Sequence, residues 1–347
     1  MSLIPATILT GFLGSGKTTL LKRVLTEAHG QKIAVIENEF GAENIDTDIL
    51  VSDTQEQIIQ MSNGCICCTI REDLRATLQD LAQKKRKGVL DFDRVVIETT
   101  GLADPGPVAQ TFFMDDEVAE SYMLDSILTL VDAKHAQQQL DDRQEARRQV
   151  GFADQIFISK TDLVSAEDVA ALEHRLKHMN PRAPIKAVHF GEVGLGEVFD
   201  LRGFNLNATL EIDPEFLADG THGDHDHDHE HSDHCDHPSH AHGHHHHQHD
   251  DVKSFVFRSK RPFDPAKLED FLGAIVNIYG PKLLRYKGVL NMLGTERKVI
   301  FQGVHQLMGS DLGPIWGKGE ERLSKMVFIG LDLPKDIFLQ GLEQCLD

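Results

Sequence analysis

Residues 10–19 of the chain read Thr10-Gly11-Phe12-Leu13-Gly14-Ser15-Gly16-Lys17-Thr18-Thr19 and match the phosphate-loop pattern G-x-x-x-x-G-K-[ST]. The four residues before them, Ala6-Thr7-Ile8-Leu9, are typical of a short buried strand, and apolar residues recur at helical spacing after them. A glycine-rich turn between a strand and a helix presents backbone N–H groups to phosphate oxygens. A chance glycine-rich turn would lack these flanking elements, so the stretch predicts a nucleotide site.

This loop and an acidic segment further along predict the phosphate and Mg²⁺ ligands. Lys17 is expected to reach the β- and γ-phosphates, and the Thr18 hydroxyl is expected to bind Mg²⁺. Glu98 ends an apolar run and begins Glu98-Thr99-Thr100-Gly101, which suits a Walker-B-type carboxylate followed by a γ-phosphate-sensing glycine. The predicted nucleotide-binding residues of the loop are Gly11, Gly14, Ser15, Gly16, Lys17, Thr18 and Thr19.

A third segment indicates which base is bound. Ser159-Lys160-Thr161-Asp162 follows a predicted strand and is similar to the guanine-reading N-K-x-D motif, with Ser159 in place of Asn. The Asp162 carboxylate would accept hydrogen bonds from guanine N1–H and the 2-amino group, and the Lys160 stem would stack on the base. Alone, these residues would also suit an ordinary helix cap. Their place in a phosphate-loop domain favours GTP over ATP.

The composition excludes some classes of partner. The 347 residues are enough for two domains, and the formal net charge of −20 argues against nucleic acid or an anionic membrane surface as the main partner. No apolar run is long enough to span a bilayer, and we see no signal peptide. Five cysteines, three of them crowded together, indicate a reducing, cytoplasmic location rather than a disulfide framework.

Apolar, β-branched runs alternate with helical stretches through the first two hundred residues. Continuous apolarity predicts mostly parallel strands buried on both faces, which gives a doubly wound α/β domain over residues 1–211. The expected strands are 6–9, 33–36, 94–97, 126–131, 155–158 and 185–188, and the expected helices include 71–87 and 166–179.

The composition changes sharply after about Ile212. Residues 222–249 carry fourteen histidines mixed with Asp, Gly and Ser, so residues 212–251 are predicted to be a linker without a core. A small α+β domain is expected over residues 252–347. Its expected elements are strands 254–257, 283–293, 299–302 and 326–329, a helix over 265–278 and a final helix from Pro334.

Three thiols crowd into one short loop, Gly64-Cys65-Ile66-Cys67-Cys68. They can close on one soft or borderline ion such as Zn²⁺ or Cu⁺. A structural zinc site is closed by four ligands. This loop therefore predicts an incomplete site, finished by Glu37 or by a partner's side chain, which suits a metal that must leave. The alternative interpretation is three buried cysteines acting as small core residues.

The histidine tract is a second predicted metal-binding element. Neutral imidazoles at this density bind Zn²⁺, Ni²⁺ or Cu²⁺ with little geometric selectivity. Its internal position and interleaved aspartates argue against an expression tag, and a solubilising linker is the remaining alternative. The candidate ligands are His225, His227, His229, His231, His244, His245, His246 and His247.

The predicted site residues follow the carboxyl ends of predicted strands. In a parallel sheet these ends share one edge, where open α/β sheets bind ligands. The segment from Glu37 to Asp46 then falls where a switch loop would lie. No glutamine is clearly placed to orient the attacking water, and Asp46 and Glu39 are the candidates for that role.

Taken together, these motifs resemble the CobW-type metallochaperone GTPases, in particular the bacterial YjiA-like branch. The resemblance extends over nearly the whole chain, and Ser159 departs from the Asn usual in the family. It rests on residues 11–19, 37–41, 63–68, 98–105 and 159–162, and on Leu284-Arg285-Tyr286-Lys287-Gly288 and Phe301-Gln302-Gly303-Val304 in the tail.

The resemblance implies a slow GTPase that carries Zn²⁺ on Cys65, Cys67 and Cys68, with Glu37 as a neighbour. GTP binding and hydrolysis would drive transfer of the metal to client apo-metalloproteins, and the C-terminal domain would help to choose the client. A metal-dependent homo-oligomer is a further expected assembly. The thiol loop lies in sequence between the two candidate switches, so the nucleotide state would alter its affinity for metal.

Three other functions stay open at this point. The first is a metal buffer whose histidine tract stores Zn²⁺ under control of the nucleotide domain. The second is cobalt handling for cobalamin synthesis, although three thiolates favour Zn²⁺ over Co²⁺. The third is a phosphate-loop kinase, against which the guanine-like motif and the thiol loop both argue.

Overall fold

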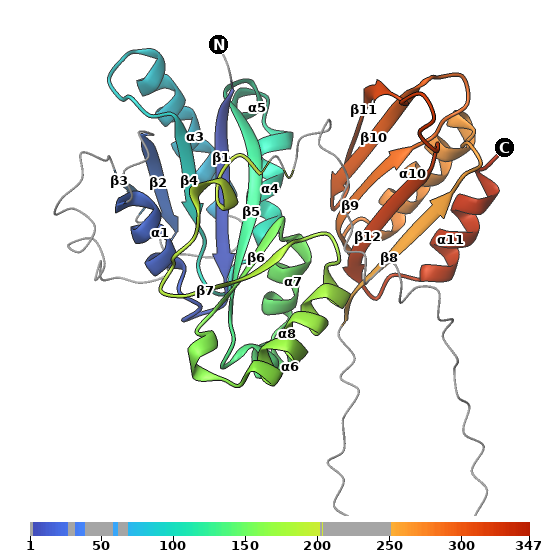
Figure 1. Cartoon of the computed structure of the whole chain (residues 1–347). Helices are drawn as coiled ribbons and strands as arrows, with labels where there is room; N and C mark the ends of the chain where they lie inside the picture. The colour runs from blue at the N-terminus through green and yellow to red at the C-terminus, as the bar shows by residue number, and fades with distance from the viewer. Residues whose placement is uncertain (1–2, 27–31, 39–57, 62–68, 202, 204–250) are drawn as a thin grey trace, which may run out of the picture.

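The computed structural model describes residues 3–26, 32–38, 58–61, 69–201, 203 and 251–347. Within these ranges the chain forms one sheet of seven strands and a second sheet of five strands (Figure 1). The first sheet is built from the residues before Phe204 and the second from the residues after Asp250. The predicted fold class, a doubly wound α/β unit followed by a smaller α+β unit, is confirmed.

The first sheet is parallel at every described pairing and has the order β3-β2-β4-β1-β5-β6-β7. Its central strands are buried on both faces, as their continuous apolarity predicts. Its strands are β1 (Ile4–Gly11), β2 (Ile33–Asn38), β3 (Ile58–Met61), β4 (Arg94–Glu98), β5 (Tyr122–Asp132), β6 (Gln155–Ser159) and β7 (Ile185–Val188).

Helices cover both faces of this sheet, and alternate residues of each strand point to opposite faces. Ile8 of β1 belongs to the core on one face, whereas its neighbour Leu9 packs with α1 on the other. The helices are α1 (Lys17–Thr26), α3 (Thr69–Arg86), α4 (Pro105–Met114), α5 (Asp116–Ser121), α6 (Ala136–Asp142), α7 (Gln144–Phe152) and α8 (Ala166–Met179), with 3₁₀ turns at Thr161–Leu163 and Leu195–Glu197.

Local capping fixes where several helices begin. Ser165 and Asp168 form a capping box at the start of α8, in which each side chain accepts a hydrogen bond from the other residue's backbone N–H. Asp104 accepts from the Gly106 N–H at 2.9 Å and caps α4, whose first residue is Pro105. These signals are local in sequence, and α8 begins and ends where the helical spacing predicts.

The second sheet is antiparallel, with the order β11-β10-β9-β12-β8. One of its faces packs on two helices around a core rich in phenylalanine. Its elements are β8 (Val252–Ser259), α10 (Pro265–Tyr279), β9 (Leu283–Leu290), β10 (Arg297–Val304), β11 (Leu307–Ile315), β12 (Ser324–Leu331) and α11 (Lys335–Gln344). The strand expected over residues 283–293 ends at Leu290 instead, because residues 291–296 turn the chain into β10.

Strand β11 is one element that the periodicity did not predict. It contains Gly309, Gly313 and Pro314, and most of its residues are exposed. Glycine and proline are depleted in strands, and an exposed edge strand does not need an apolar face. Pairing with β10 therefore determines this strand, rather than its own composition.

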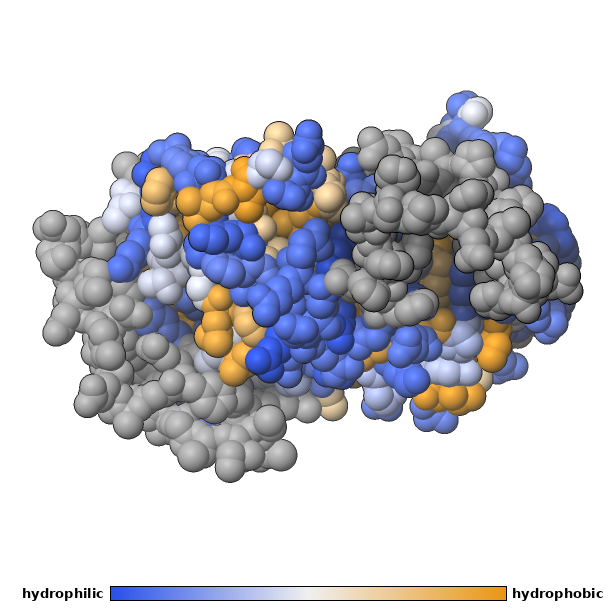
Figure 2. Space-filling model, turned by 90° about the horizontal axis from the view of Figure 1, so that it is seen from below, coloured by the Kyte–Doolittle hydropathy of each residue, from blue (hydrophilic) through white to orange (hydrophobic). Residues whose placement is uncertain are grey.

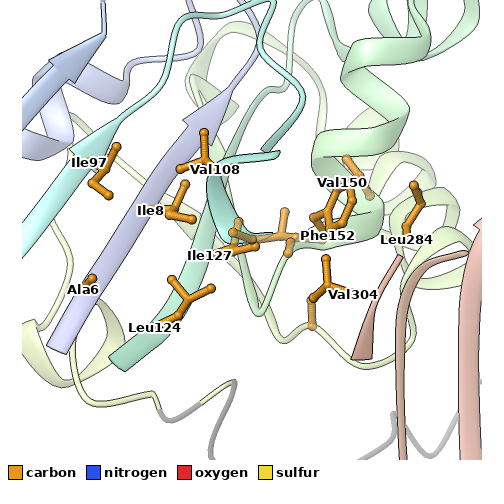
Figure 3. Packing of buried hydrophobic residues seen from close by; sticks show 14 of the residues in the cluster. Ala6, Ile8, Ile97, Val108, Leu124, Ile127, Val150, Phe152, Leu284 and Val304 are labelled. Atoms are coloured by element: carbon orange, nitrogen blue, oxygen red, sulfur yellow. The ribbon is translucent and has the colours of Figure 1, made fainter. Parts of the chain in front are cut away.

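The other face of the second sheet shares a core with the first unit. Leu284 and Val304 pack near Val150 and Phe152 of α7 (Figure 3). Helices α7 and α8 lie between the two sheets (Figure 1). The two sheets are therefore joined by apolar packing as well as by the intervening chain.

None of the described helices is long and apolar enough to cross a membrane. On the face seen in Figure 2, the described residues are mostly hydrophilic, and their hydrophobic members form separate patches.

Asn180, which follows α8, is fully buried and satisfies four backbone groups. Its Nδ2 donates to the carbonyls of Val150 at 2.8 Å and Ala153 at 2.9 Å, and its Oδ1 accepts from the N–H groups of Arg182 and Ala183, both at 3.2 Å. We expect Asn180→Ala to lower the free energy of unfolding by about 2–4 kcal/mol, because it leaves buried polar groups without partners.

Urea unfolding followed by circular dichroism measures this loss. Glu167→Ala, an exposed change in the first turn of α8, is the control and should alter stability by no more than about 0.5 kcal/mol. Equal stability of the two variants would contradict this account of Asn180.

Candidate nucleotide site

The carboxyl ends of five parallel strands bring the predicted nucleotide-binding residues to one edge of the first sheet. Leu9 of β1 is paired with Glu98 of β4, and Glu98 is in turn paired with Glu37 of β2. On the other side of β1, Asp132 of β5 is paired with Ser159 of β6. Segments up to 150 residues apart in sequence therefore meet here because parallel strands end at the same edge.

The phosphate loop between β1 and α1 has the backbone that its glycines allow. Gly11, Gly14 and Gly16 have φ values of 141°, 76° and 99°, a region that favours glycine. A Cβ on Gly11 would lie 2.4 Å from the Leu130 carbonyl oxygen, so the β1–β5 packing also requires glycine there. These glycines therefore allow the loop a backbone that other residues rarely adopt.

Lys17 folds back over the loop that precedes it. Its Nζ donates to the carbonyl oxygens of Gly11 at 2.9 Å and Phe12 at 3.4 Å. Burial lowers the pKa of Lys17, whereas the nearby Glu98 carboxylate acts to raise it. Ser15 is fully buried, and its Oγ has no hydrogen-bond partner among the described residues. A cation and an unused hydroxyl suit an anionic ligand at the loop.

Thr18 and Glu98 meet directly across the site. The Thr18 Oγ1 donates to Glu98 Oε1 at 3.0 Å, although the two residues are 80 positions apart. A hydroxyl and a carboxylate are oxygen ligands of the kind that Mg²⁺ prefers, so this pair fits the predicted Mg²⁺ site. Thr19, the other predicted threonine, is exposed at the start of α1.

The segment from the last residue of β4 to the first residue of α4 is held against the phosphate loop and α7; we call residues 98–105 the switch segment. A Cβ on Gly101 would lie 2.5 Å from the Leu13 backbone nitrogen, so the two backbones touch. Gln149 Nε2 donates to the carbonyls of Gly101 at 3.1 Å and Ala103 at 3.0 Å. Arg148 Nη1 lies 2.6 Å from Asp104 Oδ2. Sequence reasoning missed Arg148 and Gln149, because both belong to α7, which lies more than 40 residues further along the chain.

The predicted base-reading residues lie beside the phosphate loop. Ser159 Oγ donates to the Ser15 carbonyl at 2.7 Å, so Ser159 links the two segments. Lys160 has a φ of 57°, and its Nζ lies 2.8 Å from Asp132 Oδ2. Asp162 lies in the 3₁₀ turn that follows, and its half-exposed side chain lies 3.7 Å from His189 Nδ1.

Asp132 is a buried member of the site that sequence reasoning missed. Burial acts to raise its pKa, but hydrogen bonds from Lys160 and His135 outweigh that effect and hold the pKa of Asp132 below its usual range. Its Oδ1 also accepts from the Lys134 N–H at 2.9 Å. Asp132 therefore stays ionised and positions Lys160. Its place at the carboxyl end of β5 was the signal that could have found it.

Most of the predicted metal ligands lie outside the described residues. Glu37 is described, at the carboxyl end of β2 beside Glu98. Within the described part of the chain, no group of three or more His, Cys, Asp or Glu side chains is placed to hold a metal ion. The predicted residues outside the described ranges are Glu39, Asp46, Cys65, Cys67, Cys68, His225, His227, His229, His231, His244, His245, His246 and His247.

Comparison with known families agrees with this geometry. Residues 5–187 match the nucleotide-binding domain of CobW, HypB and UreG, and residues 252–346 match the C-terminal domain of the cobalamin synthesis protein CobW. The chain belongs to the CobW/HypB/UreG family.

Several relatives match this chain over nearly its whole length. The zinc chaperone YjiA of Escherichia coli is 40% identical over 339 residues, covering 97% of this chain and 96% of the relative. The zinc chaperone CobW of Pseudomonas aeruginosa is 32% identical over 376 residues, covering 99% and 92%. A crystal structure of the Zn(II)-bound YjiA GTPase from E. coli superposes with a TM-score of 0.75 at 34% identity and covers all of both chains.

Gly101→Ala tests the contact between the switch segment and the phosphate loop. The added Cβ would meet backbone atoms of Leu13, which cannot move without displacing the loop. We expect binding of a non-hydrolysable GTP analogue to weaken at least about tenfold, and binding of GDP to weaken less, because Gly101 is the residue predicted to sense the γ-phosphate. Titration with fluorescent nucleotides measures both affinities.

Gly196→Ala is the matched control, since a Cβ there has open space around it. It should leave both affinities unchanged. Equal loss of GDP and GTP-analogue binding in Gly101→Ala would contradict the assigned role of this glycine.

Proposed function

We propose that this protein hydrolyses GTP and uses the reaction to deliver Zn²⁺ to client apo-metalloproteins. The observation that carries the proposal is the 3.0 Å contact between Thr18 Oγ1 and Glu98 Oε1 at the base of the phosphate loop. This contact places a hydroxyl and a carboxylate next to the loop that would hold the phosphates of a nucleotide. The delivery of zinc is proposed because full-length relatives of the chain are named zinc chaperones.

Different residues of the chain are assigned to different parts of the nucleotide. The loop N–H groups and Lys17 hold the β- and γ-phosphates, and Ser159, Lys160 and Asp162 lie beside the guanine base. Thr18 and Glu98 hold Mg²⁺, which when bound neutralises charge on the phosphate oxygens. Hydrolysis breaks the bond between the γ-phosphorus and the bridging oxygen as a water oxygen adds, giving GDP and inorganic phosphate. We assign positioning of that water to Asp46 or Glu39.

Zn²⁺ is the cargo, and Cys65, Cys67 and Cys68 are its proposed ligands, with Glu37 completing the site. Glu37 and Glu98 are paired residues on neighbouring parallel strands, so their backbones lie about 4.8 Å apart. A proposed zinc ligand and a proposed Mg²⁺ ligand are thus adjacent. This proximity supports coupling between nucleotide state and zinc affinity.

Contacts of α7 support a role for the second sheet in the same cycle. Arg148 and Gln149 bind the switch segment, and Phe152 of the same helix packs on His305, with ring centroids 5.2 Å apart. His305 lies in the turn between β10 and β11 and also touches Gly106, where a Cβ would lie 2.5 Å from its Nε2. A movement of the switch segment would therefore reach the second sheet, which we propose helps to select the client.

Two alternative functions also have a physical basis, and experiments can distinguish them from zinc transfer. The histidine tract would let the chain act as a zinc store with a regulatory GTPase unit. The match of residues 252–346 to a cobalamin synthesis domain keeps cobalt as an alternative cargo. We favour zinc transfer because three thiolates suit Zn²⁺ and the full-length relatives are named zinc chaperones.

Asp162→Asn tests guanine recognition. A carboxylate accepts hydrogen bonds from both guanine N1–H and the 2-amino group, whereas an amide presents only one acceptor and one donor. We expect affinity for GDP to fall at least about tenfold and affinity for xanthosine diphosphate, which has a carbonyl in place of the 2-amino group, to rise. Competition against a fluorescent nucleotide measures both. Unchanged base preference would remove Asp162 from the base site.

Competition titration of Zn²⁺ against a chromophoric chelator tests the cargo and its coupling. With protein lacking residues 222–249, we expect one tight site whose affinity differs at least about tenfold between the GDP–Mg²⁺ and GTP-analogue–Mg²⁺ states. The site should disappear when Cys65, Cys67 and Cys68 are changed to Ala. Replacing Cys345, which is buried at the end of α11, by Ala is the control and should leave the site intact.

The outcomes separate the alternatives. A site that ignores the nucleotide, or that survives loss of the three thiols, would contradict zinc transfer and favour storage. Tighter binding of Co²⁺ than of Zn²⁺ at the same thiols would favour cobalt handling.

A further inference from the structure

The turn between β10 and β11 reaches from the second sheet to the first unit through the side chain of His305. The His305 ring packs on Phe152 of α7, with ring centroids 5.2 Å apart at an angle of 67°. A Cβ added to Gly106 would lie 2.5 Å from His305 Nε2, so the ring rests directly on the backbone at the start of α4. His305 thus contacts both α7, which holds the switch segment, and α4, which continues it.

Contacts within the second unit hold His305 in this position. Its Nδ1 donates to the Gly280 carbonyl at 3.3 Å, which leaves the lone pair of the neutral ring on Nε2. The hydroxyl of the buried Tyr286 lies 2.8 Å from the Leu307 carbonyl oxygen and 3.2 Å from that of His305, so it holds the backbone of the turn. His305 itself has a φ of 51°, a left-handed backbone that is uncommon for residues other than glycine. The surrounding contacts therefore determine where the imidazole lies.

The backbone under His305 is also an anchor of the switch segment. The Gly106 N–H donates to Asp104 Oδ1 at 2.9 Å, and Arg148 Nη1 donates to Asp104 Oδ2 at 2.6 Å. At the other end of the segment, the Thr99 N–H donates to a carbonyl of β1 at 2.9 Å. The switch segment is therefore anchored at both ends, once through β1 and once through Asp104 and the backbone under His305.

We propose that His305 is a positioning residue for GTP hydrolysis, which holds the start of α4 so that the switch segment keeps Glu98 and Gly101 in place. This role rests on the proposed GTPase function and adds a direction of control, since the second unit would set the rate of hydrolysis in the first. Glu98 is assigned to Mg²⁺ and Gly101 to the γ-phosphate, so a small displacement at Gly106 would misalign groups that stabilise the transition state. The phosphate loop and the base-reading residues would still bind GTP. Loss of the contact should therefore lower kcat more than it raises KM.

The surroundings of His305 favour its neutral form. Burial lowers the pKa of His305 and Arg148 acts in the same direction, whereas Asp104 and the carbonyls of Gly280 and Leu283 act to raise it. A cation here would also lie at the start of α4, where the helix dipole disfavours positive charge. A protonated His305 would compete with Arg148 for the Asp104 carboxylate. The contact is therefore complete above about pH 6.5, the ordinary pKa of histidine, and is lost as the pH falls through the lowered pKa.

His305→Asn tests this role in steady-state GTP hydrolysis by the full chain. Asparagine tolerates the left-handed backbone at this position, so the variant removes the ring without straining the turn. At about pH 8, we expect kcat to fall at least about fivefold and KM to change less than about twofold. His174→Asn, a change of an exposed histidine on α8, is the matched control and should leave both constants unchanged.

The pH profile of hydrolysis gives a readout that loss of packing alone would not move. Acid should release the contact in the wild type, whereas His305→Asn has no imidazole to protonate at this position. The ratio of the wild-type kcat to that of His305→Asn should therefore decline toward one as the pH falls from about 8 to about 5. A ratio that does not decline would overturn the proposal.

Gly106→Ala tests the same contact from the first unit. The added Cβ would meet the His305 ring and, at 2.9 Å, the Phe152 ring, so we expect a similar loss of kcat. Combining this change with His305→Asn should lower kcat little further than either change alone, because both break one contact. Losses that multiply in full would show two independent effects and contradict the role of this contact.

Hydrolysis by the wild type distinguishes a failure of the positioning role from a failure of the proposed function. A wild-type chain that does not hydrolyse GTP would overturn both. Wild-type hydrolysis that His305→Asn leaves unchanged, or a variant that raises KM without lowering kcat, would overturn the positioning role alone.

Hydrogen exchange supplies a measurement that does not depend on turnover. In the GDP–Mg²⁺ state, the peptide that contains Gly106 should exchange faster in His305→Asn than in the wild type, because the start of α4 has lost its restraint. His174→Asn should exchange there as the wild type does. Equal exchange in His305→Asn and the wild type would also overturn the positioning role.

Discussion

Parallel pairing of β1 with its two neighbours is the constraint on which the rest of the structure depends. The Thr99 N–H donates to the Leu9 carbonyl at 2.9 Å, and Thr99 Oγ1 donates to Thr10 Oγ1 at the same distance. These contacts fix the end of β4 against the start of the phosphate loop. Once that register is set, Glu98 must lie beneath Thr18, and Gly101 must pass against Leu13. The nucleotide site follows from the sheet.

Helix α7 connects this site to the second sheet. One of its turns carries Arg148 and Gln149, which bind the switch segment, and its last residue, Phe152, packs on His305. The same helix contributes Val150 to the core shared by the two sheets (Figure 3). A rigid helix that makes polar contacts with the switch segment and apolar contacts with the second sheet can pass a small displacement between them. This arrangement gives a physical route by which GTP hydrolysis would affect client binding.

Basic side chains lie at both edges of the first sheet. At the carboxyl edge, Lys17 and the loop N–H groups would face a polyanionic nucleotide, and the ionised Asp132 holds Lys160 in place. At the amino edge, Asp154 is outnumbered by basic groups that come from both sheets. In a chain with a formal net charge of −20, such local basic sites must be built by burial and pairing.

The sequence by itself determined the parallel α/β class, the phosphate loop, most strand and helix positions, and the family resemblance. These features depend on residues that are close together in sequence, as at the Ser165–Asp168 capping box or the glycines at 11 and 16. The predicted thiol loop and histidine tract lie outside the described residues, so their metal ligation stays a prediction.

Only the tertiary structure decided the contacts of Gln149 with Gly101 and of Asp154 with Arg285, which join residues 48 and 131 positions apart. No local pattern encodes such pairs, because they depend on which elements the sheet register and the shared core bring together.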